Sequence, residues 1–531
     1  MLKGNTYLNM THQQSFSRKL FLLIISATII RCLVAAFLNL GNDEVYYFTY
    51  ALQPDWNHFD HPPLVGLFIR FFTLNLHWSN QFTMRLTAII GAGVNTWLIA
   101  QCGRLLRNER AGFIAAILYT ASIYTSIISG IFILPDSPQV VFWMMALWVL
   151  IKLIQRPQHT KVNNWLLLFG LLVGITTMCK VHGIFLWFGF GIYILLYDRK
   201  WLSNRYLYLS VFITLICISP IFIWNYYNDF ITWRFHSSRV SMTHASFNTD
   251  AFITATIGQI AYNNPINVVL SCMAVIAFIK RKYFIQRDIG RLLLTCALPI
   301  IFVTTGISLF RDVLPHWSGP GFMTLLLPTA AFIENKITEG GKIIYKKILD
   351  FNVGLIASVL IIGLFIVQLY PGTMGNKTAP ELGANDVTLD MYGWKTLKPA
   401  FEKIREKDIQ DGQMQASAAL VVNKWFPAGH LLFYVAEPLH MRVIGVGQLD
   451  DLHKFVWLNK QMGFVPKGGD AYFISTSNYY SNPKDIYKND FLKINLADSI
   501  RQYRGGKVAR YWYIYQLKGA ASNLSTQLDS L

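Results

Sequence analysis

Long apolar blocks constrain this chain more than any other feature of its sequence. A helix needs about 20 mostly apolar residues to cross the hydrocarbon core of a bilayer, and many blocks here approach that length. Hydrophobic residues make up 53% of the 531 residues and charged residues only 14%, whereas an average soluble domain has roughly 25% charged residues. The sequence therefore predicts a polytopic α-helical membrane protein and excludes a soluble, disordered or collagen-like chain.

Eleven apolar blocks are predicted to form about eleven transmembrane helices. The blocks are 20–38, 83–100, 112–128, 137–151, 164–178, 183–196, 206–224, 266–279, 292–309, 319–333 and 353–369. The first block follows Arg18-Lys19 and has no clear small-residue cleavage site. We interpret it as a retained signal anchor.

Basic residues set the predicted orientation. The net charge is +18, and Lys and Arg gather in every second loop, as with Arg104, Arg107 and Arg110. This distribution is the positive-inside pattern of membrane proteins. Topology thus explains the excess charge, and no nucleic-acid partner is predicted. With the N-terminus inside and an odd number of spans, the chain after Tyr370 is expected to lie outside.

Two domains are predicted, a transmembrane domain over 1–370 and an α/β domain over 371–531. In the second region the apolar runs have the length of strands and are bounded by turn residues. The predicted strands are 418–422, 431–435, 441–446, 471–474 and 511–517, and the predicted helices are 401–407 and 452–459. We find no internal repeat.

Carboxylates and bases concentrate in the loops that are predicted to lie outside. They are Asp43, Glu44, Asp60, His61, Asp136, Lys180, Arg234 and His316. A carboxylate such as Asp43 could take a proton from an acceptor hydroxyl, and cations such as Lys180 and Arg234 could hold a phosphate.

Taken singly, these residues also have structural explanations. An acidic pair can simply complement a helix dipole, and Arg85, at the outer end of the second block, can reach the membrane interface. No His/Cys cluster has the spacing of a zinc site. The prediction of a site therefore depends on the face that the residues share.

The first outer loop contains two motifs, Asn42-Asp43-Glu44-Val45-Tyr46-Tyr47 and Phe59-Asp60-His61-Pro62-Pro63-Leu64. They resemble the first outer loop of the protein O-mannosyltransferase superfamily, which includes the bacterial aminoarabinose–lipid A transferases (glycosyltransferase family 39-like, GT-C fold). Further similar segments follow in order: Arg85-Leu86, Leu134-Pro135-Asp136-Ser137-Pro138, Lys180, Ile223-Trp224-Asn225 and Pro315-His316-Trp317. Together they extend over roughly residues 20–333.

The resemblance implies a GT-C-like fold and an inverting glycosyltransferase of class EC 2.4. Its donor would be a sugar linked to polyprenyl phosphate, and its acceptor lipid A, another glycan or a protein. The reaction would take place at the outer face of the bacterial inner membrane, with residues 371–531 in the periplasm. Which sugar and which acceptor are used stays open.

The resemblance also implies roles for particular residues. Asp43 would be the catalytic base and Asp136 would also line the site. If Asp43 is not the base, the alternative bases are Asp136 and Glu44. The candidates for contact with the donor phosphate are Lys180, His61, Arg234, Arg85 and His316. Some relatives place a divalent metal near the acid that corresponds to Asp60, and no cofactor is assigned here. His61 stands where the aminoarabinose transferases usually have lysine, and a neutral histidine is a weaker partner for an anion.

Two other functions fit the sequence less well. A transporter or flippase for a lipid-linked or anionic substrate would tend to place its binding groups near the midplane, often in two related halves. The polar residues here lie mostly in loops instead. A binding protein that uses its helices only as an anchor would need far fewer helices.

Overall fold

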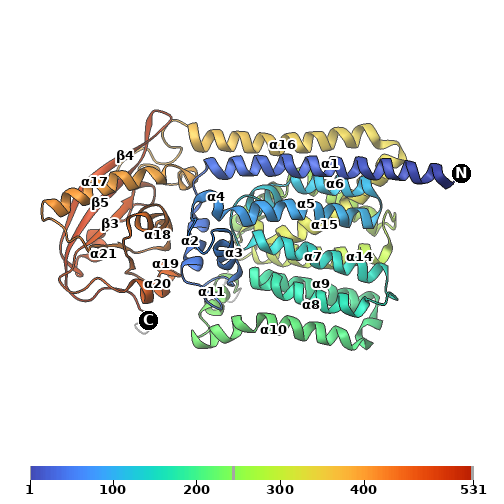
Figure 1. Cartoon of the computed structure of the whole chain (residues 1–531), viewed down its shortest axis with the longest axis horizontal. Coiled ribbons are helices and arrows are strands. Elements are labelled where there is room, and N and C mark those ends of the chain that lie inside the picture. Colours follow the sequence, from blue (N-terminus) through green and yellow to red (C-terminus); the bar gives the residue numbers. More distant parts are fainter. Residues whose placement is uncertain (1, 242–245, 528–531) are drawn as a thin grey trace. The chain divides into compact units, whose positions relative to one another are not determined.

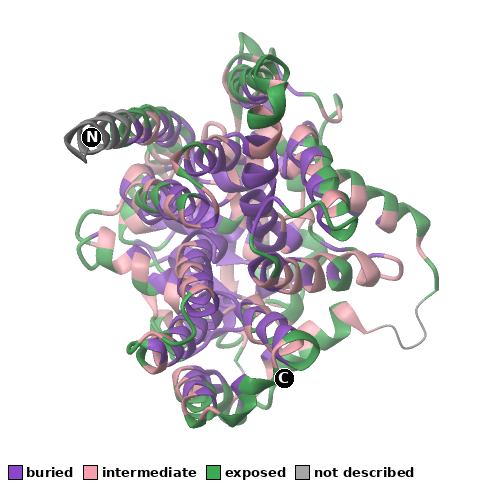
Figure 2. Ribbon diagram, turned by 90° about the vertical axis from the view of Figure 1, so that its right-hand side faces the viewer, coloured by how far each residue is buried: buried purple, intermediate pink, exposed green. Residues whose placement is uncertain are grey.

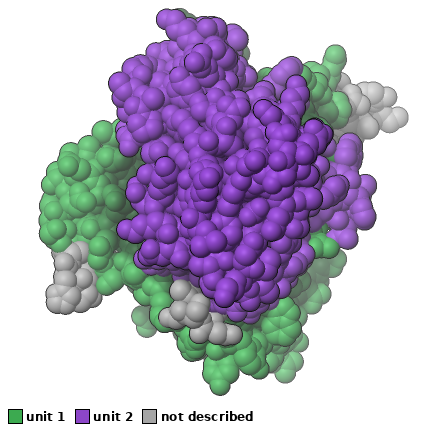
Figure 3. All heavy atoms as spheres, turned by 90° about the vertical axis from the view of Figure 1, so that its left-hand side faces the viewer, with its two compact units in different colours: residues 1–34, 56–72, 82–359 green, residues 35–55, 73–81, 360–531 purple. Residues whose placement is uncertain are grey.

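The computed structural model describes residues 2–241 and 246–527 (Figure 1). The chain divides into two compact units (Figure 3). Unit 1 comprises Met1–Val34, Trp56–Phe72 and Phe82–Val359, and unit 2 comprises Ala35–Asp55, Thr73–Gln81 and Leu360–Leu531. Two short segments from the first part of the chain thus cluster with the C-terminal residues. The predicted boundary at residue 370, between a transmembrane domain and an α/β domain, stays a prediction.

Helices make up the larger unit. The α-helices that lie wholly or partly in unit 1 are α1 (Leu2–Phe37), α3 (Leu64–Phe72), α4 (Gln81–Met84), α5 (Leu86–Leu106), α6 (Glu109–Thr120), α7 (Asp136–Gln155), α8 (Val162–Cys179), α9 (Phe185–Tyr197), α10 (Arg205–Tyr227), α11 (Ile231–Val240), α12 (Thr249–Tyr262), α13 (Pro265–Ile279), α14 (Arg287–Ile307), α15 (Gly319–Lys336) and α16 (Lys342–Leu369). Short 3-10 or π-helical turns connect them: η1 (Tyr124–Ile128), η2 (Val181–Ile184), η3 (Arg199–Ser203), η4 (Pro315–Ser318) and η5 (Ile337–Gly341).

Each of the eleven apolar blocks is helical in the structure, which confirms the predicted fold class. Among the described residues, seven helical stretches are long and apolar enough to cross a membrane. One of them, Pro315–Leu369, contains both α15 and α16, and the bent pair of α12 and α13 adds an eighth. The block at 112–128 is divided between the short helix α6 and the π-helical turn η1, and the block at 183–196 lies in η2 and the short helix α9. Those two blocks are therefore helical without having the length of a full span.

Close helix packing holds unit 1 together. Helices α7, α8 and α10 lie side by side, as do α9, α14 and α15 (Figure 1). The buried residues gather in the interior of the helix bundle (Figure 2). Trp143 and Phe190 belong to its hydrophobic core. At Gly170 an added Cβ would lie 2.1 Å from the carbonyl oxygen of Ser210, so only glycine allows α8 and α10 to approach this closely. Small residues at such contacts are typical of helices packed in a membrane.

Unit 2 contains a five-stranded mixed sheet. Its strands are β1 (Ala419–Val422), β2 (Val443–Gly445), β3 (Ala471–Thr476), β4 (Phe491–Arg504) and β5 (Lys507–Ala520), in the order β2-β1-β3-β5-β4. Strand β1 runs parallel to β2 and β3, and β5 runs antiparallel to β3 and β4. The helical elements of this unit are α2 (Asn42–Leu52), η6 (Val387–Met391), η7 (Trp394–Thr396), α17 (Leu397–Gln410), α18 (Trp425–Leu431), η8 (Leu432–Ala436), η9 (Glu437–Leu439), α19 (Leu449–Leu452), α20 (Phe455–Met462), η10 (Ser477–Tyr479) and α21 (Pro483–Tyr487).

The predicted strand at 431–435 is wrong, because these residues are helical in α18 and η8. All five are buried, and a short apolar run is equally compatible with a buried strand and a buried helix. Strand β4 was not predicted, because its residues are exposed and not buried. It is an edge strand with mostly exposed, polar residues, so no apolar run marks it.

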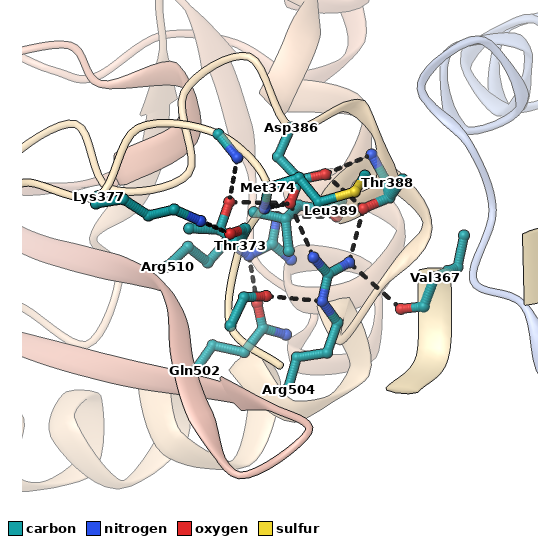
Figure 4. Close-up of polar contacts among 12 residues, drawn as sticks. Val367, Thr373, Met374, Lys377, Asp386, Thr388, Leu389, Gln502, Arg504 and Arg510 are labelled. Carbon is teal, nitrogen blue, oxygen red and sulfur yellow. Dashed lines mark hydrogen bonds and ion pairs between the residues drawn. The ribbon is translucent and has the colours of Figure 1, made fainter. Parts of the chain in front are cut away.

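A fully buried ion pair organises one end of the sheet (Figure 4). Arg504 Nη2 donates to Asp386 Oδ2 at 2.8 Å, and both side chains have no exposed surface. Arg504 also donates to the carbonyl oxygen of Gly372 at 2.9 Å and to Thr388 Oγ1 at 2.7 Å. Burial raises the pKa of Asp386, but hydrogen bonds and the charge of Arg504 outweigh it and hold the pKa below its ordinary value.

Replacing Arg504 by methionine is expected to destabilise the protein by about 3–5 kcal/mol, because it leaves the carboxylate of Asp386 buried without its cation. The melting temperature of the full-length protein in detergent measures the effect. Arg501→Met is the matched control, since Arg501 is exposed on the same strand. Equal melting temperatures for the two variants would contradict the prediction.

Candidate functional site

A buried ion pair joins two helix ends in unit 1. Lys180 Nζ lies 2.7 Å from Asp136 Oδ2, and the two side chains are only 3% and 2% exposed. Asp136 is the first residue of α7 and Lys180 directly follows α8. A carboxylate at a helix N-terminus and an ammonium at a C-terminus both complement the helix dipoles. The pair thus fixes two charges at neighbouring helix ends.

Polar neighbours complete this pair. Tyr124 donates a hydrogen bond to Asp136 Oδ1 at 3.1 Å, and Gln139 Nε2 donates to the carbonyl oxygen of Lys180 at 3.3 Å. His182 and His316 lie close enough to interact electrostatically with Asp136. The structure therefore places His316 near the Asp136–Lys180 pair, and the function of these residues as one site stays a prediction.

Tyr124 and Gln139 were not among the predicted site residues. Gln139 follows Asp136 by one helical turn, so the spacing alone could have indicated that they share a face. Tyr124 lies in the π-helical turn η1, twelve residues before Asp136, and no sequence pattern indicates that contact.

His61 belongs to the same group of residues. The pKa of His61 is lowered to about 3, chiefly by burial; His236 and Lys180 act in the same direction, and Asp60 and Asp136 oppose the shift. The rings of His61 and His236 are 6.1 Å apart. His61 is consequently neutral at pH 7, and Lys180 supplies the positive charge beside it.

The helix α11 packs against the segment that carries His61. Asn57 donates to Thr232 Oγ1 at 3.1 Å, Thr232 donates to the carbonyl oxygen of His58 at 3.1 Å, and His236 Nε2 lies 2.6 Å from the carbonyl oxygen of Asp60. Arg234 lies on this helix with an exposed side chain. The helix thus carries an exposed cation next to the segment 56–61.

Arg85 packs against the turn that precedes Asp136. It is fully buried, and its guanidinium carbon lies 5.5 Å from the centre of the Phe132 ring. The carbonyl oxygen of Phe132 accepts a hydrogen bond of 2.6 Å from Ser137, the residue after Asp136. The described contacts of Arg85 therefore stabilise the turn that leads into α7, and its contact with a phosphate stays a prediction.

Within the described ranges, no three His, Cys, Asp or Glu side chains converge as a metal site. Asp60 is bound to His236 through its main-chain oxygen. A role for the Asp60 carboxylate as a metal ligand stays a prediction.

Asp43 and Glu44 lie in the first turn of α2, in unit 2. Glu44 is 2% exposed, and its Oε2 accepts a hydrogen bond of 2.8 Å from the backbone N–H of Gly41. This is the reciprocal bond of a capping box. Asp43 instead presents an exposed side chain. Glu44 thus has a structural task in the helix cap, whereas Asp43 is the more accessible carboxylate.

The remainder of α2 packs against α18 and η8 of the same unit. The rings of Tyr46 and Trp425 lie 5.2 Å apart and those of Phe48 and Phe433 4.9 Å apart, both edge to face. At Gly429 an added Cβ would lie 2.9 Å from the Val45 side chain. These first-loop aromatic residues are thus committed to packing within the protein.

The residue before Asp43 is held by a buried carboxylate. Asp390 Oδ2 accepts hydrogen bonds from Asn42 Nδ2 at 2.9 Å and from Tyr479 at 3.1 Å. His430 Nε2 lies 3.0 Å from the carbonyl oxygen of Leu40 and 2.9 Å from that of Asp390. The C-terminal part of the chain therefore fixes the backbone from which Asp43 projects. We call Asn42, Asp390, Tyr479 and His430 the α2 clamp.

The clamp residue Asp390 is expected to make the stability of the folded protein depend on pH. Burial raises the pKa of Asp390 to about 6, against the lowering effects of Asn42, Tyr479 and Arg510. Between about pH 4 and 6 the unfolded chain releases this proton while the folded chain retains it. The contribution of Asp390 to stability is therefore fully present below about pH 4 and is lost as the pH rises through about 6.

Asp390→Asn, which cannot titrate, is expected to become more stable relative to the wild type as the pH rises from 4 to 7, by at most about 3 kcal/mol. The difference in melting temperature between the two proteins, measured across this range, tests the expectation. Asp411→Asn, at an exposed position, is the control. A difference that does not change with pH would contradict the shifted pKa.

The helices and the small mixed sheet have the GT-C fold that is seen in solved structures of membrane glycosyltransferases. ArnT from Cupriavidus metallidurans, solved bound to undecaprenyl phosphate, is 14% identical, with a TM-score of 0.63 over 93% of this chain and 97% of that chain. The apo structure of the same ArnT gives 13% identity, a TM-score of 0.59 and the same coverage. At this identity the similarity establishes the fold.

The family comparison agrees with the structures. Residues 60–224 match the family described as dolichyl-phosphate-mannose-protein mannosyltransferase. The search of curated proteins returns no match. The resemblance to this superfamily and the GT-C fold are confirmed, and the chain is a multi-pass membrane protein.

Proposed function

We propose that this protein is an inverting glycosyltransferase that moves a sugar from a polyprenyl-phosphate donor to an acceptor at the outer face of the bacterial inner membrane. The buried Asp136–Lys180 pair at the helix ends of a GT-C fold is the observation that carries the proposal. It is supported by the family match over 60–224 and by the fold shared with an ArnT that was solved with undecaprenyl phosphate.

The proposed reaction is a single displacement. Asp43 takes the proton of an acceptor hydroxyl, whose oxygen then forms a bond to the anomeric carbon. The bond between that carbon and the phosphate oxygen breaks, and the polyprenyl phosphate leaves with the electron pair. The attack comes from the side opposite the leaving group, as in inverting glycosidases, with the acceptor in place of water.

Lys180 is the cation best suited to the leaving phosphate. Asp136 holds its ammonium at 2.7 Å, so the group is positioned before a substrate arrives, and a preorganised charge stabilises developing negative charge without a reorganisation cost. Arg234 could add a second charge from α11, and His316 a hydrogen bond. Because His61 is neutral, its proposed part is a hydrogen bond and not a permanent charge.

The α2 clamp gives unit 2 a role in this proposal. Within the clamp, Asp390 binds Asn42, which is the residue before the proposed base Asp43. The C-terminal part of the chain would thus position the base, whatever part it also takes in choosing an acceptor.

Mass spectrometry of lipids and surface glycans tests the function. The comparison is between a null strain and the same strain complemented with the wild-type gene. A sugar-sized mass that is absent in the null strain and restored by the wild type identifies the acceptor, and an accumulated polyprenyl-phosphate sugar identifies the donor. An unchanged glycan profile with a lipid-linked substrate retained on the inner face would instead indicate a flippase.

A further inference from the structure

A cavity of about 430 Å³ lies in unit 1, among α9, α13 and α14. One end is lined by basic and aromatic side chains, and the remainder by apolar ones. The lining includes Tyr197, Arg281, Arg287, Arg291, Leu298 and Phe302. We call this cavity the arginine groove.

The groove opens at the end of unit 1 opposite the Asp136–Lys180 pair. Helix α9 is joined to Lys180 by the short turn η2 and ends at Tyr197, which lines the groove. Helix α14 begins at Arg287, and the chain reaches His316 only beyond its other end. At 1.5 Å per residue the 21 residues of α14 extend about 30 Å, the thickness of a bilayer core. The groove is therefore separate from the proposed catalytic site.

The basic side chains of the groove are held in place by their neighbours. The guanidinium carbon of Arg291 lies 4.4 Å from the centre of the Tyr197 ring, and that of Arg287 lies 5.9 Å from the Tyr283 ring. Cation–π contacts of this kind orient a guanidinium group without neutralising its charge.

Arg281 is fixed through its backbone. It has a φ of 58°, and the N–H of Lys282 donates to the carbonyl oxygen of Ala277 at 3.0 Å. This bond is the closing bond of a Schellman motif, which ends α13 in one defined geometry. The backbone at the mouth of the groove therefore has one defined geometry.

Carboxylates offset only part of this charge. Asp288 pairs with Arg291 at 3.1 Å, and Asp198, at the end of α9, lies near Tyr193 of the same region. Arg281 and Arg287 line the groove in addition to Arg291, so its mouth keeps a net positive charge.

The apolar part of the groove is about as long as the acyl-chain layer of one leaflet is thick. Leu294, Leu298 and Phe302 continue the stripe of Arg287 and Arg291 along one face of α14. From Arg291 to Phe302 the helix rises about 16 Å, close to half of the roughly 30 Å hydrocarbon core. Phe302 is 67% exposed, so the groove opens toward the surface that faces lipid.

We propose that the arginine groove binds an anionic phospholipid from the leaflet on the arginine-rich side. Its phosphate contacts Arg287 and Arg291, and one acyl chain follows Leu294, Leu298 and Phe302. Basic pockets between membrane helices are suited to anionic headgroups. A free phosphate would use the arginines but leave the apolar length of the groove unused, so the lipid is the better occupant.

Native mass spectrometry of the full-length protein in neutral detergent tests this site. The probes are phosphatidylglycerol, phosphatidylcholine with the same chains, and glycerol phosphate, which has no chains. We expect phosphatidylglycerol to bind about tenfold more tightly than phosphatidylcholine, and glycerol phosphate not to compete with it. Equal binding of the two lipids, or effective competition by glycerol phosphate, would overturn the proposal.

Variants locate the binding. Arg287→Gln combined with Arg291→Gln should remove the preference for phosphatidylglycerol, whereas Arg104→Gln combined with Lys161→Gln, at exposed positions on the same predicted side, should retain it. Leu298→Trp fills the apolar part without changing charge and should weaken binding of both lipids. If the arginine variant does not fold, Leu298→Trp decides the question, because unchanged lipid binding by it would place the lipid elsewhere.

Discussion

Asp43→Asn is expected to lower sugar transfer by about 10²- to 10⁴-fold, the contribution of a positioned general base. The loss should appear in kcat, with little change in donor KM, because asparagine retains the size of the side chain but cannot accept the hydroxyl proton. The fold should survive, since an acidic residue in the first turn of a helix contributes only about 0.3–1 kcal/mol. Transfer by purified protein in liposomes measures the effect.

Glu44→Gln is the matched control for this prediction. Its amide oxygen can still accept the cap bond from Gly41, which Glu44 Oε2 accepts at 2.8 Å in the wild type. We expect this variant to retain most of the activity. Loss of transfer in Glu44→Gln together with full activity in Asp43→Asn would assign the base to Glu44 and overturn the assignment to Asp43.

Lys180→Met is expected to destabilise the protein by about 3–5 kcal/mol and to abolish transfer, because it leaves Asp136 buried without its cation. The double variant Asp136→Asn with Lys180→Met removes both charges and should recover most of the stability. It should not recover transfer, since the phosphate would still lack its cation. Melting temperature and transfer rate, measured together, separate the two effects.

Lys161→Met is the control on the same helix. Lys161 is exposed at the other end of α8, so its replacement should leave melting temperature and transfer unchanged. If Lys180→Met were as active as this control, Lys180 would have no part in binding the phosphate. If the double variant were no more stable than Lys180→Met alone, the ion pair would not be the cause of the instability.

The parts of the structure that could be predicted are those that depend on local sequence. Apolar length marks each of the eleven helical blocks, because a membrane span needs a continuous apolar run. Strands β1, β3 and β5 are apolar and buried and were predicted in their place, whereas the exposed edge strand β4 has no such signal. The segment 431–435 shows the limit, because burial on all sides hides the difference between helix and strand.

The residues of the candidate site stay a prediction, and the contacts among them could not be predicted from the sequence. The resemblance assigned Asp136 and Lys180 to one site, yet their ion pair joins residues 44 positions apart and required the structure. The bond between Asn42 and Asp390 joins residues 348 positions apart. No motif surrounds Asp390, so sequence reasoning gave no reason to connect it with the proposed base.

The clustering of Ala35–Asp55 with the C-terminal residues affects how this protein can be divided. A chain truncated after Tyr370 would lose Trp425, Gly429 and Phe433, and with them the surface that covers α2. A chimera that exchanges only the C-terminal region with a relative would combine α2 of one protein with the covering residues of another. The side chains of this hydrophobic core would then not fit each other. Successful exchange would have to move the segments 35–55 and 73–81 together with 360–531, so these three separate stretches of the gene are expected to evolve as one unit.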